Sequence, residues 1–265
     1  MTVRGKGKPK AEIVYRPYLK GRAISLLAAR RGLRILAYQV AFAFIFLMIG
    51  PLLTFDSLVL RLITNLAMVA GLMALLYAEG TRAGVEDISF AQIALQRQQD
   101  GKTIEGRELD RCYHPAKGFV IAVLGALPLL LISLVFALTV QPRQYVLGGL
   151  PDWVSAYERR ADIGLALSYY HEQRVLALPD MLGIAVRLFI LPFINTVGQD
   201  AKGALYLLDK LSPLIVLLPG CAYGIGYLRG PALRAQVHGA IESNSRRRQR
   251  RRKATKAAEE PRRLV

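Results

Sequence analysis

The chain has 265 residues, of which 53% are hydrophobic, and it carries a formal net charge of +17. This combination excludes an ordinary soluble globule, in which charged residues are spread over the whole surface. The charges must instead be kept apart from the apolar runs, which is typical of an all-α, polytopic membrane protein.

Five apolar stretches divide the chain, and we predict that each is helical. They cover residues 35–53, 58–78, 118–140, 181–197 and 211–228. The first three are long enough to cross a hydrocarbon layer ~30 Å thick, which takes about 20 helical residues. The sequence therefore predicts a transmembrane domain over residues 35–228, between a basic N-terminal segment (1–34) and a basic tail (229–265).

The segments around the second stretch are predicted to be short helices and turns. Gly50–Pro51 and a short turn follow the first stretch, with Asp56 or Ser57 as the N-cap of the second. Residues 85–98 are predicted to be helical, because acidic residues open the segment and an arginine closes it. Ile88, Ala91 and Leu95 form an apolar stripe on this helix, which could lie on the membrane or on another helix. A further helical turn is expected within residues 105–111.

Lysine and arginine counts predict the orientation. Residues 1–34 hold ten of them, residues 79–117 hold six and residues 229–265 hold twelve, whereas residues 141–180 hold only four. Basic residues collect on cytoplasmic flanks of membrane proteins. We therefore expect a multi-pass protein of the cytoplasmic (cell) membrane, with both termini in the cytoplasm and residues 141–180 outside.

This orientation restricts the number of crossings. Three spans that start inside leave the chain outside after residue 140, so an odd number of further crossings must return the tail. Residues 211–228 are uncharged, whereas residues 181–197 contain an arginine and a proline. We predict four crossings, with 181–197 as a re-entrant or interfacial helix; five crossings is the alternative. In the external loop, residues 153–178 are predicted to be helical.

Four polar residues within the apolar stretches are candidate intramembrane sites: Arg61, Arg187, Asn65 and Asn195. An arginine in the middle of a bilayer costs about 2.5–3.5 kcal/mol on insertion scales. Arg61 lies close to the external end of its span, so we expect it to reach the headgroups. Arg187 is expected to face headgroups or a wet cavity without an acidic partner, because the apolar stretches hold no carboxylate in mid-membrane.

Small residues recur at helix-packing spacing in the second and last stretches. The candidates are Ala67, Gly71, Gly220, Gly224 and Gly226. Small side chains at this spacing let two helix backbones approach closely. The pattern predicts close helix packing without singling out a homodimer.

Motifs of known chemistry are missing from the sequence. It has no glycine-rich phosphate loop, no nucleophile elbow and no zinc-binding HExxH, and its three histidines fall in different segments. Cys112 and Cys221 fall in a loop and in a span, so they are not expected to pair. We therefore expect no enzyme activity, no metal and no cofactor.

The tail carries the strongest charge feature of the chain. Its candidate binding residues are Arg246, Arg247, Arg248, Arg250, Arg251, Arg252 and Lys253. Residues 229–242 are expected to continue the last helix and residues 243–265 to be disordered. The favoured ligand is anionic lipid, at ~1 kcal/mol per basic residue near the surface. Nucleic acid or the ribosome, and an acidic protein partner, are the alternatives.

Two classes of function remain. The first is a non-catalytic accessory or scaffold component of a membrane complex, whose basic cytoplasmic faces bind lipid. The second is an oligomeric transporter or channel subunit for a small anionic solute, with Arg61 or Arg187 at its constriction. The first class is favoured because the first three apolar stretches, which are long enough to cross the membrane, hold too few polar residues for one copy of the chain to line a pore. Whether the chain forms a homo-oligomer or joins a larger complex is left open.

Overall fold

The computed structural model describes residues 13–53, 55–140, 157, 160, 162, 178–198 and 201–259. Within these residues every regular element is a helix, as the composition predicts. The elements are α1 (Leu26–Ile49), the 3-10 helix η1 (Gly50–Leu53), α2 (Leu58–Gln99), α3 (Gly106–Leu109), α4 (Lys117–Thr139), α7 (Leu178–Val197), α8 (Lys202–Leu228) and α9 (Gly230–Glu259). The segments that contain α1, α2, α4, α7 and α8 are long and apolar enough to cross a membrane.

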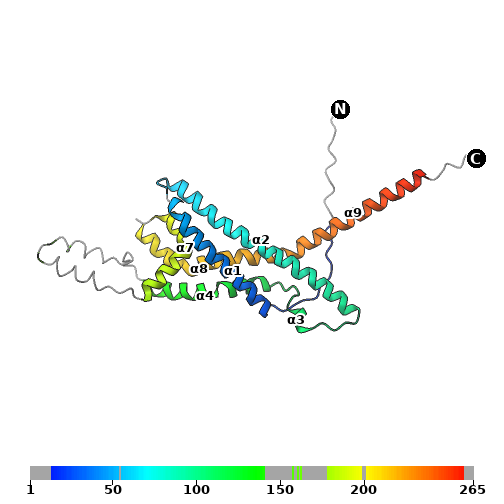
Figure 1. The fold of residues 1–265 in the computed structure, drawn as a ribbon, viewed down its shortest axis with the longest axis horizontal. Helices are drawn as coiled ribbons and strands as arrows, with labels where there is room; N and C mark the ends of the chain where they lie inside the picture. The colour runs from blue at the N-terminus through cyan, green and yellow to red at the C-terminus, as the bar shows by residue number, and fades with distance from the viewer. Residues whose placement is uncertain are drawn as a thin grey trace, which may run out of the picture.

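Helix α8 forms the centre of the bundle. It has its most extensive contacts with α4 and α2, and α1 also packs against α4 (Figure 1). Helices α2 and α8 run in the same direction, because Gly80 faces Tyr223 and Gly84 faces Tyr227 one turn later. The glycines allow backbone contact at both levels, which brings the two helices close together.

The bundle has two distinct ends, which we name by what lies there. At the tail end, α8 finishes and α9 begins; at the hairpin end, η1 joins α1 to α2 (Figure 1). The described N-terminal residues and the segment between α2 and α4 also lie at the tail end (Figure 1). The N-terminal segment, the 100–116 region and α9 therefore share one end of the molecule.

Helix α7 has both of its ends at the hairpin end. Near its start, Gly183 lies against the ring of Phe136, close to the last residue of α4. Near its finish, the Asn195 side-chain amide donates a hydrogen bond to the Gly50 carbonyl over 3.3 Å. Helix α7 thus lies across the hairpin end and contacts α1, α2, α4 and α8.

Two predicted helix boundaries are wrong, and charged residues explain both. Residues 85–98 are not a separate helix but the last part of the continuous α2, and Ile88 and Ala91 of the predicted stripe are buried. Its Asp87 is buried at the tail end, so charge did not mark a solvent-exposed segment there. Helix α8 starts at Lys202, well before the predicted apolar stretch, and Asp209 and Lys210 within it contact neighbouring helices.

The tail also differs from its prediction. Helix α9 starts after a break at Arg229 and runs to Glu259, so residues 243–259 are helical and not disordered. The sequence between Ala240 and Glu260 contains neither glycine nor proline and is rich in arginine, lysine and alanine. These residues have high helix propensity, which accounts for the long helix.

Smaller features agree in part with the sequence. Ser57 is the N-cap of α2, although its side chain makes no capping hydrogen bond. The turn expected within residues 105–111 is α3, which begins with a capping box formed by Glu105 and Glu108. The helix predicted over residues 153–178 lies almost entirely outside the described residues.

Candidate functional site

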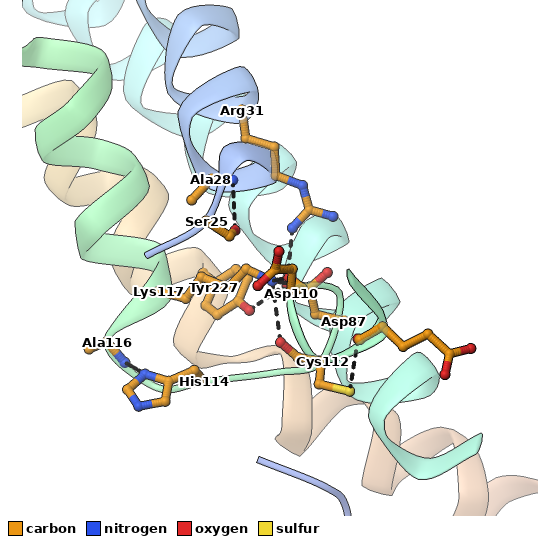
Figure 2. Close-up of polar contacts among 11 residues, drawn as sticks. Ser25, Ala28, Arg31, Asp87, Asp110, Cys112, His114, Ala116, Lys117 and Tyr227 are labelled. Atoms are coloured by element: carbon orange, nitrogen blue, oxygen red, sulfur yellow. Dashed lines mark hydrogen bonds and ion pairs between the residues drawn. The ribbon is translucent and has the colours of Figure 1, made fainter. Parts of the chain in front are cut away.

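A cluster of buried ionic side chains lies at the tail end, centred on the carboxylate of Asp87 in α2. One oxygen of that carboxylate, Oδ2, accepts hydrogen bonds from Lys117 Nζ at 2.6 Å, Tyr227 Oη at 2.7 Å and Arg31 Nη1 at 2.9 Å (Figure 2). The Lys117 side chain is 0% exposed and that of Asp87 is 3% exposed. A single oxygen atom therefore connects α1, α2, α4 and α8.

The lysine also fixes the loop that precedes its own helix. Lys117 Nζ donates to the carbonyl oxygens of Asp110 at 2.8 Å and Cys112 at 3.2 Å (Figure 2). An ammonium group has three donors, and all three are used here. Burying a charge is tolerated when it is paired and hydrogen-bonded in this way. Lys117 thus holds the loop before α4 against Asp87 of α2 at the tail end. We call the Asp87–Lys117 ion pair and these two loop contacts the clamp.

Two layers cover the cluster from outside. The Tyr113 ring stacks on that of Tyr227 with centroids 5.2 Å apart, and Tyr18 meets Tyr113 edge to face at 5.6 Å. The extended N-terminal segment lies over them, where the Gly21 amide donates to the Tyr113 carbonyl and the Leu19 amide donates to Ala91. The cluster is thus closed off by aromatic rings and by the start of the chain.

Sequence reasoning missed Asp87, although a signal for it exists. Asp87 shares one face of α2 with the small residues Gly80, Ala83, Gly84 and Ala91, and all of them are buried. Their spacing of three and four residues is that of one helix stripe. A carboxylate within a stripe of small residues indicates a buried position, whereas its place in an acidic helix start indicated a solvated one.

The thiol of Cys112 should react slowly in the native protein. Burial raises the pKa of Cys112 to about 11, although the nearby Lys117 ammonium acts in the opposite direction. Because the thiolate is the reactive form, a raised pKa leaves Cys112 protonated at about pH 8, where an ordinary cysteine already ionises. With Cys221 replaced by serine, maleimide labelling should be slow at about pH 8 and should accelerate as the pH approaches the raised pKa.

The same Cys221→Ser variant in denaturing detergent provides the control, since Cys112 should then label at the rate of a free thiol. Rapid labelling of the folded protein at neutral pH would contradict a closed tail end. It would show that the loop carrying Cys112 opens to solvent.

A cavity of about 120 Å³ lies next to the cluster, between α1 and α2. Its walls carry charges of both signs and two tyrosines. They are formed by Arg31, Arg34, Ile35, Tyr38, Glu79, Arg82, Ala83, Glu86 and Tyr223. Arg34 pairs with Glu79 at 3.2 Å and Arg82 with Glu86 at 3.3 Å. The cavity is thus a polar recess that adjoins the ionic cluster around Asp87.

Arg187 has an acidic partner, which corrects the expectation that it would have none. Its Nη2 lies 2.7 Å from Asp209 Oδ2 and its Nε lies 3.3 Å from Asp209 Oδ1. The Asp209 side chain is 2% exposed, while that of Arg187 is 29% exposed. The partner was missed because Asp209 precedes the apolar stretch and belongs to the first turns of α8, which the apolar pattern did not include.

The other intramembrane candidates also lie at helix contacts near the hairpin end. Asn65 Nδ2 donates to the Arg61 carbonyl at 2.7 Å, and Asn195 bonds to η1 as described above. The Arg61 guanidinium lies beside Gly198, where a built Cβ would be 3.2 Å from Arg61 Nη1. Arg61 thus lies beside the end of α7, whereas Arg187 belongs to α7 and pairs with Asp209 of α8, and no described contact joins the two arginines in one constriction.

The small-residue candidates fall into two groups. A Cβ built on Gly220 would lie 3.3 Å from that of Ala122, and one on Gly224 would lie 2.6 Å from the Phe119 ring, so both contact α4. Gly226 packs on the backbone of α2. In contrast, Gly71 has nothing within 4 Å, and Ala67 beside it is exposed. The last-span glycines lie inside the bundle, whereas the pair in α2 faces outward.

The basic tail residues lie on α9, which projects from the bundle (Figure 1). Arg246, Arg247 and Arg248 are exposed, and Arg246 lies 3.7 Å from Glu242 one turn earlier. The remaining candidates, Arg250 to Lys253, continue the same helix. Among the described residues, no three histidine, cysteine or acidic side chains gather as a metal site would require.

Comparison with protein-family models, with curated proteins and with solved structures finds no match to the chain. We therefore infer its function from the contacts of its own residues.

Proposed function

We propose that the chain is a non-catalytic scaffold or accessory component of a membrane complex, which crosses the membrane four times and has both termini in the cytoplasm. Its crossing helices would be α1, α2, α4 and α8. Helix α7 would be the re-entrant or interfacial element, because both of its ends contact the hairpin end. The tail end would face the cytoplasm, since it carries the basic segments.

The observation that carries this proposal is the arrangement of α9. It extends a basic helix away from a bundle whose buried charges at both ends are paired with one another. Exposed Arg246, Arg247 and Arg248 present guanidinium groups that suit phosphate or carboxylate partners. Such a helix is suited to contact an anionic surface, either lipid at the cytoplasmic face or a partner within the complex.

The interior of the bundle supports a structural role. A second cavity of about 40 Å³ lies among α1, α2, α4, α7 and α8, and its lining is largely apolar. Gln39 is the polar residue in that lining, and its Nε2 already donates to the Val216 carbonyl at 3.1 Å. A small, mainly apolar cavity is poorly suited to conduct an anion.

One observation favours the alternative of a transporter or channel subunit for a small anionic solute. Among the described residues, Arg61 Nε, Asn65 Oδ1 and Gln39 Oε1 are buried without a hydrogen-bond partner. Buried polar groups are normally satisfied, so such atoms can mark a place where water or an ion enters. An oligomer of the chain would be needed to join them into a path.

Removal of residues 246–265 tests the proposal. This change deletes ten basic residues and leaves the bundle untouched. At ~1 kcal/mol each, the loss of only three contacts lowers affinity about 100-fold. Full-length protein purified in mild detergent should carry a stoichiometric partner, measured by light scattering and mass spectrometry. The truncated protein should lose that partner and keep its thermal stability.

A variant with Lys102, Arg107 and Arg111 replaced by glutamine is the matched control, since it removes charge from the same end but not from α9. It should retain the partner. The proposal fails if full-length protein purifies only with copies of itself and conducts chloride or sulfate in reconstituted vesicles, because that result identifies the transport alternative.

A further inference from the structure

The cavity between α1 and α2 has the size and position of a ligand site. At about 120 Å³ it is far larger than the ~10–15 Å³ that one water molecule requires on the same measure. Helices α1 and α2 meet at η1 and separate toward the tail end (Figure 1), and side chains of both helices and of α8 line the cavity. It is lined by Ile35, at the start of the first apolar stretch, and by Arg31 and Arg34 just before it. This is the level at which headgroups meet a bilayer under the topology proposed above.

Both signs of charge line the cavity. Arg31, Arg34 and Arg82 supply guanidinium groups, and Glu79 and Glu86 supply carboxylates. A solely anionic ligand would face the two carboxylates, and a solely cationic one would face the three guanidinium groups. A ligand that carries both a phosphate and an amine can satisfy both sets.

The existing ion pairs leave these groups open to exchange. The Arg34–Glu79 and Arg82–Glu86 pairs both include largely exposed side chains, and such pairs are weak. Arg31 uses Nη1 to hold Asp87, and this is its only hydrogen bond within the part of the chain that the structure describes. Its remaining donors are therefore fixed in place by Asp87 and free for a ligand.

We propose that this cavity binds the headgroup of an ethanolamine phospholipid. The phosphate would accept hydrogen bonds from Arg31 and Arg34, whose guanidinium groups match its geometry. The primary amine would donate to Glu79 and Glu86, with the Tyr38 and Tyr223 rings completing the walls. The inference rests on the proposed membrane topology, which places the cavity beside the lipid headgroups.

Thermal unfolding of the delipidated protein in detergent tests the site. Short-chain phosphatidylethanolamine should raise the unfolding temperature more than phosphatidylglycerol or phosphatidylcholine at equal concentration. Arg34→Gln should weaken ethanolamine-lipid binding about tenfold, as expected for the loss of one charge-assisted hydrogen bond. Replacing Glu79 and Glu86 by glutamine should abolish the preference for phosphatidylethanolamine over phosphatidylglycerol.

Arg97→Gln is the matched control, because Arg97 forms a similar exposed pair with Glu108 at 3.1 Å outside the cavity. This variant should bind the lipid as the native protein does. Each variant should unfold at the native temperature without lipid, and Glu79→Gln alone replaces the double variant if the latter is unstable. Equal stabilisation by phosphatidylglycerol, or an unchanged preference after the glutamate substitutions, would overturn the zwitterionic site.

Two further measurements are needed. One distinguishes a lipid ligand from a soluble metabolite, and the other distinguishes the lipid site from the scaffold function. If soluble glycerophosphoethanolamine stabilises the protein as well as the lipid does, the ligand is a free metabolite and the lipid assignment is wrong. Protein truncated after Ser245 should keep its lipid preference, because α9 takes no part in the cavity. If full-length protein carries no partner but keeps its preference for phosphatidylethanolamine, that result counts against the scaffold function alone.

Discussion

Replacing Asp87 with leucine should destabilise the bundle more than removal of any other described ion-pair partner. The substitution leaves Lys117 fully buried and Arg31 largely buried without their common carboxylate. Breaking a buried ion pair by removing one partner typically costs about 3–5 kcal/mol, because the remaining charge is uncompensated. Unfolding of purified protein by increasing SDS in mild detergent, followed by circular dichroism, would measure the loss.

Combining Asp87→Leu with Lys117→Met separates the effect of the unpaired charge from the effect of altered packing. Lys117→Met alone should cost less, since Asp87 keeps its bonds to Arg31 and Tyr227. The double variant Asp87→Leu/Lys117→Met should recover part of the stability lost by Asp87→Leu, because it removes the unpaired ammonium. If the two losses simply add, the lysine and the aspartate are not coupled, and the clamp described here is wrong.

A glycine-to-alanine comparison within α2 should give effects of opposite sign. At Gly80 a Cβ would overlap the backbone carbonyl of Tyr223 in α8, which cannot move without shifting the helix. Overpacking of this kind costs about 1–3 kcal/mol. At Gly71 a Cβ would meet nothing within 4 Å, so alanine should be neutral or stabilise the helix by up to about 1 kcal/mol.

The unfolding temperatures of the two variants in the same detergent give a direct comparison, since the chemical change is identical. A stabilising Gly80→Ala would show that α2 and α8 do not approach at backbone contact. A strongly destabilising Gly71→Ala would instead indicate that the outward face of α2 is covered, for example by a second copy of the chain.

The helical class follows from the sequence because apolar length and charge segregation act within one segment at a time. Helix α4, for example, matches the predicted stretch 118–140 to within one residue at each end. Pairings between helices do not follow in the same way. Asp87 pairs with Lys117, and Asp209 with Arg187, between different helices, and the sequence does not show which of their faces meet. Each residue therefore resembled a surface or unpaired charge until its neighbour was known.

For the same reason, the sequence does not show which small residues lie at a helix contact. Gly71 and Gly80 lie in one helix and are equally small, yet only Gly80 faces α8. Residue spacing identifies a stripe on a helix but not the direction in which that stripe points. That direction is fixed by the tertiary arrangement, here by the central position of α8.

The contacts of the extended N-terminal segment have a consequence for the order in which the protein is made. The Val14 amide donates to the Ala235 carbonyl in α9 at 3.3 Å, and Gly21 is bonded to Tyr113. Val14 is therefore bonded to a helix that is synthesised after all the other described helices. The Leu19 and Gly21 bonds can form once α2 and residues 100–116 have been made, whereas the Val14 bond requires α9. The N-terminal segment therefore packs in two stages, and the second, at Val14, can follow only after α8 and α9 have been made.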